Sequence, residues 1–144
     1  MNHDTYDQDY LKAILQGSHT IALVGASPKP DRPSYGVMRF LLSQGYDVYP
    51  VNPGQAGKEI PGREVYATLK DVPVAIDMVD VFRAPEFLGE VVDEALSLEA
   101  KPKVIWGQLG VRNDEAAAKA EGAGIKIVMD RCPAIEIPRL NISR

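Results

Sequence analysis

The residues best suited to bind a ligand follow the first apolar run of the chain. Ile21–Val24 leads directly into Gly25, Ala26 and Ser27. After a buried strand, backbone N–H groups and the dipole of the next helix favour an anion. The following loop, residues 28–35, contains three prolines and is longer than the Gly-x-Gly-x-x-Gly turn of an ordinary dinucleotide site. We therefore expect a nucleotide ligand other than ordinary NAD, and a helix that opens at Gly36.

Side chains of the same loop add donors and positive charge. Ser27 and Ser34 supply hydroxyl groups, while Lys29 and Arg32 supply cations. This pattern predicts a pyrophosphate cradle. The alternative is a proline-rich surface loop whose charges are simply solvated.

The end of the second apolar run narrows the choice of nucleotide. A site for NAD usually places Asp or Glu there to hold the ribose hydroxyls. Here the run Asp47–Val51 ends in Asn52 and Pro53, without a carboxylate. A missing acid suits a phosphorylated ribose, as in NADP or coenzyme A, and Pro50 and Pro53 offer a flat apolar surface for adenine. The alternative is a plain turn that stops the strand.

Further candidates follow the third and fourth apolar runs. Arg83 precedes a helix start and could pair with a phosphate or with Asp80. Asp77 and Asp80 are three residues apart at an expected strand end, so they do not form an obvious acid/base pair. The loop Gly107–Gly110 suits either close approach to a ligand or turn geometry alone. Cys132 could meet a thiol of the ligand, although a lone cysteine is more often a small buried residue.

Short apolar runs that alternate with helical patterns predict an α/β fold. The expected strands are Ile21–Val24, Asp47–Val51, Val74–Val79, Lys103–Trp106 and Ile125–Met129, and the expected helices are Thr5–Gln16, Gly36–Gln44, Pro85–Leu98 and one capped by Asn113. We expect a Rossmann-like parallel sheet of about five strands flanked by helices, in a single domain, with a tail from Cys132 that packs across the surface. Ligands of such sheets lie at the carboxyl ends of the strands.

Composition excludes several other classes of protein. The 144 residues carry a net charge of −4, which argues against nucleic-acid and anionic-membrane partners. One cysteine cannot form an internal disulfide, no apolar run has the length of a membrane span, and the polar N-terminus is unlike a signal peptide, so we expect a cytoplasmic protein. His3 and His19 are the only histidines, and neither suits a catalytic triad at this edge of the sheet. No metal site is expected.

Taken together, four stretches resemble a known family: Val24–Ser27, Tyr46–Pro53, Ile60–Tyr66 and Leu69–Pro73. Their combination is similar to the CoA-binding domain family, whose members include small stand-alone proteins. The same domain forms the N-terminal part of the succinyl-CoA synthetase α subunit and of ADP-forming acetyl-CoA synthetases. The resemblance covers about residues 15 to 138.

This resemblance implies that the ligand is coenzyme A or an acyl-CoA. The phosphates would meet Gly25, Ala26 and Ser27, the adenosine would lie between Pro50, Asn52 and Pro53, and the pantetheine arm would follow Val81–Ala84 and Gly107–Gly110. Arg32 and Lys58 are candidates for the charged phosphates. The full set of expected cofactor-binding residues also includes Ser34, Tyr35, Gly36, Val81, Phe82, Arg83, Gly107 and Gln108.

The synthetases use a phosphorylated histidine in a further domain and a nucleotide-grasp partner, and neither is expected here. We therefore expect a CoA-binding protein without synthetase chemistry of its own, such as a carrier, a sensor or a partner subunit. Two alternatives stay open: an NADP-dependent oxidoreductase, and an interaction module with a vestigial nucleotide site. A protein partner or a homodimer is also left open.

Overall fold

Five parallel strands form one sheet in the computed structural model, which describes residues 1–143. The strands are β1 (Thr20–Val24), β2 (Asp47–Val51), β3 (Met78–Val81), β4 (Val104–Gly107) and β5 (Lys126–Val128), in the spatial order β2-β1-β3-β4-β5. From β1 the chain first adds β2 on one side and then adds β3, β4 and β5 on the other, so the strand order reverses between β1 and β3. This is where a doubly wound sheet binds ligands. The predicted parallel α/β sheet is confirmed.

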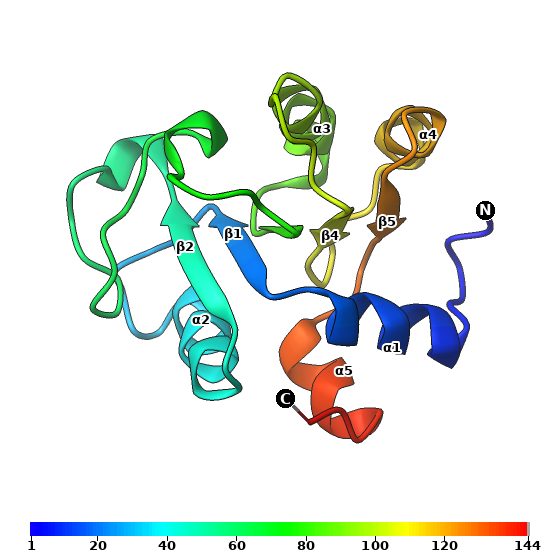
Figure 1. The fold of residues 1–144 in the computed structure, drawn as a ribbon, viewed down its shortest axis with the longest axis horizontal. Coiled ribbons are helices and arrows are strands. Elements are labelled where there is room, and N and C mark those ends of the chain that lie inside the picture. Colours follow the sequence, from blue (N-terminus) through cyan, green and yellow to red (C-terminus); the bar gives the residue numbers. More distant parts are fainter. Residues whose placement is uncertain (144) are drawn as a thin grey trace.

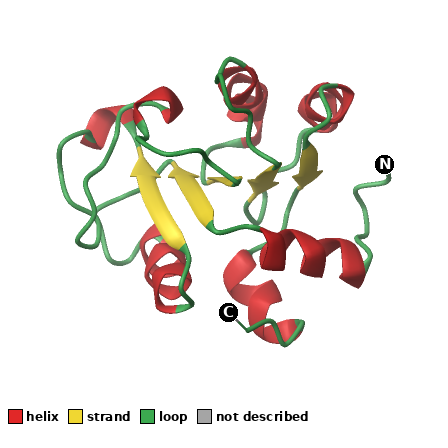
Figure 2. Ribbon diagram, viewed as in Figure 1, coloured by secondary structure: helices red, strands yellow, loops and turns green. Residues whose placement is uncertain are grey.

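Helices cover both faces of this sheet (Figure 1). One face carries α1 (Gln8–Gly17), α2 (Pro33–Ser43) and α5 (Pro133–Arg139), and the other carries α3 (Leu88–Leu96) and α4 (Asp114–Gly122). Three short 3-10 turns, η1 (Pro53–Gln55), η2 (Leu69–Asp71) and η3 (Pro85–Phe87), lie in the connections, as Figure 2 shows in red among the green loops. Because strand side chains alternate between faces, β1 sends Ile21 and Leu23 into one core and Ala22 and Val24 into the other.

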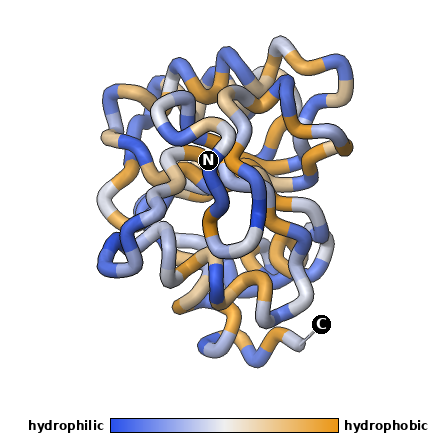
Figure 3. Tube along the Cα trace, turned by 90° about the vertical axis from the view of Figure 1, so that its left-hand side faces the viewer, coloured by the Kyte–Doolittle hydropathy of each residue, from blue (hydrophilic) through white to orange (hydrophobic). Residues whose placement is uncertain are grey.

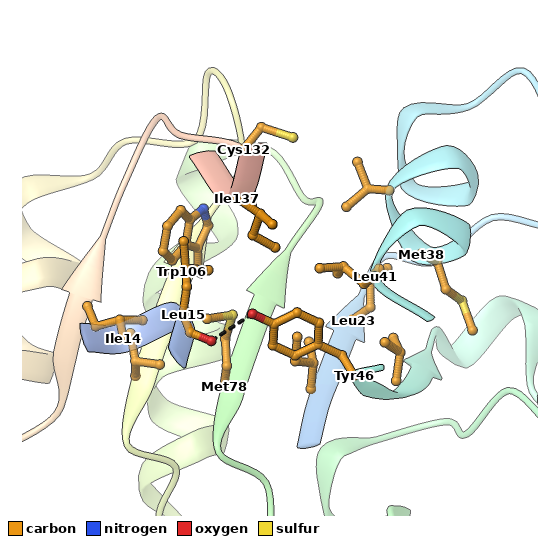
Figure 4. Close-up of a cluster of buried hydrophobic side chains, with 14 of the residues drawn as sticks. Ile14, Leu15, Leu23, Met38, Leu41, Tyr46, Met78, Trp106, Cys132 and Ile137 are labelled. Carbon is orange, nitrogen blue, oxygen red and sulfur yellow. Dashed lines mark hydrogen bonds between the residues drawn. The ribbon is translucent and has the colours of Figure 1, made fainter. Parts of the chain in front are cut away.

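The core beneath α1, α2 and α5 is the larger of the two and contains the single tryptophan (Figure 4). The Trp106 side chain is fully buried, and its indole N–H donates to the Arg131 carbonyl at 3.0 Å. The Tyr46 hydroxyl crosses this core to donate to the Leu15 carbonyl at 2.6 Å. These bonds satisfy the polar atoms of two large side chains, so the rings can be buried at little cost.

Two helix starts follow from capping residues. The Asn113 side chain accepts from the backbone N–H of Ala116 at 3.1 Å, which confirms the predicted cap of α4. Helix α2, however, begins at Pro33 and not at Gly36. Proline at the first helical position needs no N–H partner and has a suitable φ, so the helix starts three residues earlier than expected.

The third strand and the tail also differ from expectation. The strand spans Met78–Val81 and not Val74–Val79, because Asp80 lies inside it and does not end it. Asp77 lies at the opposite end, where its carboxylate accepts the N–H groups of His19 and Thr20. The tail does not simply cross the surface: it forms helix α5, which buries Ile137.

Polar and apolar residues alternate along the outer segments of the chain, as the colours of Figure 3 show. This alternation is typical of elements that have one buried side and one side in water. None of the helices within residues 1–143 combines the length and apolar character that a membrane span requires.

Candidate functional site

Two pockets open side by side at the carboxyl ends of the strands. The first, here the α2 pocket, has a volume of about 420 Å³ and lies between the start of α2, the β3–η3 segment and the β4–α4 loop. The second, here the β2 pocket, has about 390 Å³ and lies between the ends of β1 and β2, the residues before η2, and α3. Both pockets are lined by Gly25 and Arg83, so they meet at the reversal point of the sheet.

Gly25 forms the floor at this meeting point. Its φ of +88° lies in the left-handed region, and a Cβ placed there would lie 2.6 Å from the Phe82 carbonyl oxygen. Glycine is therefore required so that β1 and β3 can approach each other where they end. The requirement comes from packing within the chain, and not only from room for a phosphate.

The backbone donors expected to bind phosphate have acceptors within the chain. Gly25 N–H and Ala26 N–H donate to the Val51 carbonyl at 2.9 and 3.4 Å. Ser27 N–H donates to the Ser34 hydroxyl oxygen at 3.2 Å. Anion-binding capacity therefore lies elsewhere, in the Ser27 and Ser34 hydroxyl hydrogens and in the first turn of α2.

Arg83 supplies positive charge where the two pockets meet. Its guanidinium lies 4.4 Å from the centre of the Phe87 ring and 3.8 Å from the Glu90 carboxylate, and the side chain is 39% exposed. The suggested pairing with Asp80 is wrong, since Asp80 has no hydrogen-bond partner among the described residues. A long cation with only a loose, exposed partner can turn toward a ligand.

Asp80 is instead a buried acid in the middle of the sheet. Its register partners are Leu23 in β1 and Trp106 in β4, so it shares their face of the sheet. The side chain is fully buried, and this burial raises the pKa of its carboxyl well above the usual value. Asp80 lines neither pocket, and its neutral form suits this apolar setting.

Asn52 joins the loops that follow β1 and β2 by two hydrogen bonds. Its amide nitrogen donates to the Ala26 carbonyl at 2.8 Å, and its amide oxygen accepts from Gly54 N–H at 2.9 Å. The residue lines the β2 pocket next to Pro53. Its main effect is to hold the two loops together around that pocket.

The β4–α4 loop is closed tightly on itself and against the end of β5. A Cβ on Gly107 would lie 2.7 Å from the Val111 carbonyl oxygen, and Gly110 has φ +82°. The Asp130 carboxylate accepts from Gly110 N–H at 2.7 Å, and Asp130 N–H donates to the Val111 carbonyl at 3.2 Å. Turn geometry therefore accounts for both glycines, and the loop presents Gln108 to the α2 pocket.

The structure brings nine of the sixteen expected residues to the two pockets. Seven of them line the α2 pocket: Gly25, Ser27, Arg32, Ser34, Phe82, Arg83 and Gln108. The other two, Asn52 and Pro53, line the β2 pocket. The remaining seven, Ala26, Tyr35, Gly36, Pro50, Lys58, Val81 and Gly107, line neither pocket. Lys58 is exposed, whereas Pro50 and Val81 are buried within strands.

Sequence reasoning missed one side of the β2 pocket, formed by Ala67, Thr68 and Glu94. The Glu94 carboxylate accepts from Leu69 N–H at 2.7 Å and so joins α3 to η2. None of these residues directly follows a strand, so the rule that selects strand ends could not find them. The Glu94 carboxylate therefore lies in the pocket beside the end of β2, where the sequence predicts no carboxylate.

Other reactive side chains lie away from the pockets. Cys132 is 5% exposed and packs in the core with Trp106 and Ile137 (Figure 4). His3 contacts Tyr6 and Glu121, and His19 lies just before β1 at the opposite edge of the sheet. Within residues 1–143, no three His, Cys, Asp or Glu side chains are grouped so as to hold a metal ion.

The fold is that of a Rossmann-like α/β domain, with two pockets that meet where the strand order reverses. The CoA binding domain family matches this chain over residues 19–138, so the chain belongs to this family. The resemblance stated from the sequence is confirmed.

Three relatives illustrate the range of this family. The uncharacterised Bacillus subtilis protein YneT is 39% identical over 122 residues, which are 85% of this chain and 87% of YneT. A hypothetical protein from Pyrococcus horikoshii OT3 is 42% identical with a TM-score of 0.89, and the match covers 99% of this chain and 97% of that one. The α subunit of ADP-forming acetate–CoA ligase I from Pyrococcus furiosus is 34% identical over 79 residues, but these are 52% of this chain and only 17% of the subunit.

Proposed function

We propose that the protein binds coenzyme A or an acyl-CoA in the two joined pockets. The observation that carries this proposal is that the α2 pocket and the β2 pocket meet at Gly25 and Arg83. A ligand that fits has one part for each pocket and a negatively charged middle between them. Coenzyme A has this form, because a diphosphate joins its adenosine to its pantetheine arm.

The lining of each pocket suggests the orientation of the ligand. The β2 pocket offers Pro53 and the backbone of Gly54 to a flat base, and its one carboxylate, Glu94, already accepts from Leu69 N–H. The α2 pocket offers Phe82, Pro85 and Val111 to a slender, largely apolar arm. We place the adenosine in the β2 pocket, the diphosphate at Arg83, and the pantetheine arm in the α2 pocket. In this orientation Arg32, which lines only the α2 pocket, lies away from the ribose phosphate.

Binding without synthetase chemistry is the second part of the proposal. Neither histidine lies at the pockets: His3 is buried against Glu121, and His19 precedes β1 at the far edge. The residues that line the pockets can position and neutralise a ligand, and no histidine is among them. The Thr68 hydroxyl at the β2 pocket donates to the Asp71 carboxylate at 2.9 Å, a pair that we assign to the η2 turn and not to catalysis. The role is then that of a cytoplasmic carrier or sensor, or of a subunit that presents CoA to a partner.

Isothermal titration calorimetry with CoA, acetyl-CoA, NADP and NAD tests this function. Saturable binding of CoA or acetyl-CoA, with no heat from NAD or NADP, is the expected result. Binding of NADP in place of CoA would favour an oxidoreductase. A failure to bind any of the four would leave a domain that acts through protein partners.

A further inference from the structure

The segment before α1 lies on the β5 side of the molecule (Figure 1), where Tyr6 joins it to the end of β5. The Tyr6 hydroxyl accepts from Met129 N–H at 2.8 Å and lies 2.7 Å from Nδ1 of His3. The other ring nitrogen of His3, Nε2, lies 2.9 Å from the Glu121 carboxylate in α4. Because a carboxylate only accepts, Nε2 donates to Glu121, and in the neutral ring Nδ1 accepts from the Tyr6 O–H. The His3 side chain is buried, so these bonds hold Tyr6 in one position.

Tyr6 also contacts Arg131, two residues beyond Met129. The Arg131 guanidinium lies 5.0 Å from the centre of the Tyr6 ring and donates to the Asp4 carbonyl at 3.3 Å. The backbone N–H of Arg131 donates to the Gly107 carbonyl at 3.3 Å. Tyr6 therefore contacts the residues on both sides of Asp130.

Asp130 holds the loop that lines the α2 pocket. Its φ of +57° is left-handed, and a non-glycine residue keeps such a conformation where its surroundings determine it. The Asp130 carboxylate accepts from Gly110 N–H at 2.7 Å, and the Asp130 N–H donates to the Val111 carbonyl at 3.2 Å. Gly110 and Val111 line the α2 pocket, whereas Tyr6 and residues 129–131 do not.

We propose that Tyr6 is a positioning residue for the α2 pocket, which acts through residues 129–131 on the loop 108–111. Its effect on coenzyme A rests on the proposed function. Without the Tyr6 hydroxyl, Met129 N–H loses its acceptor and the conformation of Asp130 is less firmly determined. The loop must then be ordered when the ligand binds, and this ordering weakens binding. Tyr6 does not line the β2 pocket either, so the effect is confined to the part of the ligand in the α2 pocket.

Tyr10 provides a matched control four residues further along the chain. Its ring stacks on that of Tyr6 with the centres 6.1 Å apart, and its hydroxyl donates to the Ile127 carbonyl at 3.2 Å. Tyr6→Phe and Tyr10→Phe each keep the ring and remove a hydrogen bond to the backbone of β5 or its end. Ile127 lies inside β5, so its loss of a partner should not reach Asp130.

The test measures binding to the wild type and to both variants by calorimetry. The ligands are CoA and adenosine 3′,5′-bisphosphate, which has no pantetheine arm. Tyr6→Phe should raise the Kd of CoA about threefold, the cost of ordering a small part of the site, and Tyr10→Phe should leave it unchanged. The Kd of the bisphosphate should be the same for all three proteins. Both variants should unfold at a lower urea concentration than the wild type, so lost stability alone does not explain a difference between them.

The backbone amide signal of Gly110 reports on the loop without any ligand. In ¹H–¹⁵N NMR spectra of the free proteins, Tyr6→Phe should shift this signal and speed its hydrogen exchange, whereas Tyr10→Phe should do neither. Should Tyr6→Phe fail to fold, Arg131→Met removes the other contact of Tyr6 and keeps its hydroxyl. This variant should raise the Kd of CoA and shift the Gly110 signal in the same direction.

Three results would overturn the inference. An unchanged Kd of CoA in folded Tyr6→Phe would refute the positioning role, and an equal rise in Tyr10→Phe would show a general loss of stability. An equal loss of CoA and bisphosphate binding would show that the effect does not act through the α2 pocket. No binding of CoA by the wild type would refute the proposed function instead, and the Gly110 signal would then decide the positioning role by itself.

Discussion

The Asp130 carboxylate accepts a hydrogen bond from Gly110 N–H at 2.7 Å, which joins the end of β5 to the loop that carries Gln108. Asp130 holds this position with a φ of +57°, a left-handed conformation that Asp and Asn tolerate better than other non-glycine residues. The segment after β5 therefore shapes the α2 pocket without lining it.

Asp130→Ala should loosen this loop. The variant loses the bond and places Ala in a left-handed conformation, so the free energy of unfolding should fall by about 1–2 kcal/mol. The Kd of CoA should rise several-fold, because Gln108 is no longer held in place. Urea unfolding and calorimetry measure the two effects. Asp130→Asn keeps an acceptor and the tolerance for this φ, so a loss equal to that of Ala would show that the bond is not responsible.

Gly25→Ala should destabilise the whole protein. The added Cβ would meet the Phe82 carbonyl oxygen at 2.6 Å, at a φ that strains any L side chain. We expect a loss of about 2 kcal/mol or more in the free energy of unfolding, measured by chemical denaturation. The control is Gly89→Ala in α3, where a Cβ meets nothing within 4 Å and helix propensity predicts a gain of up to about 1 kcal/mol. Equal stability of the two variants would contradict this account of Gly25.

Asp80→Asn should change how stability depends on pH. An Asp carboxyl in the unfolded chain has a pKa of 3.8, and burial raises the pKa of Asp80 well above this in the folded protein. Between these two values the folded state holds one more proton than the unfolded state, so this group lowers stability as pH rises, by about 1.4 kcal/mol per pH unit. The Asn variant lacks this penalty, and its advantage over the wild type should grow from about pH 4 upward. Parallel stability profiles of wild type and variant, from urea unfolding between pH 5 and 8, would show that Asp80 does not titrate in this way.

Arg83→Ala should weaken CoA and dephospho-CoA by the same factor. Arg83 lines both pockets, so it lies where the diphosphate is proposed and both ligands carry that group. A lost charge-assisted hydrogen bond corresponds to about a tenfold rise in Kd. Lys101→Ala, which removes an exposed cation just before the amino end of β4 and so at the opposite edge of the sheet, is the matched control. A larger loss for CoA than for dephospho-CoA would place Arg83 at the ribose phosphate instead.

The sheet and the edge that carries the two pockets were predictable because strand periodicity and strand ends are local signals. The same rule predicts that Gly25, Arg83 and Gln108 lie at this edge, since each lies just beyond a strand, and all three line the α2 pocket. The side formed by Thr68 and Glu94 could not be found, because it depends on how α3 packs against η2.

Tertiary packing also explains two other differences between the predicted and the observed structure. The apolar run predicts a strand that ends at Val79, yet Asp80 lies within β3. A charged residue is rarely buried without a partner, so no local pattern indicates this placement. The N–H groups of Gly25 and Ala26 were expected to face a ligand, but they share the Val51 carbonyl. The distances between segments decide which acceptor a backbone N–H group uses. A local sequence pattern does not predict these distances.

The most direct test of the central claim is to follow backbone amide signals by two-dimensional ¹H–¹⁵N NMR while CoA is added. The amino edge of the sheet provides an internal control, because it holds a further pocket lined in part by Gly17, Lys103 and Gly124. The account predicts that the largest shifts occur at Gly25, Arg83 and Gln108, and that the amino-edge signals stay in place. Shifts concentrated at the amino edge, or no shifts at a saturating concentration of CoA, would contradict it.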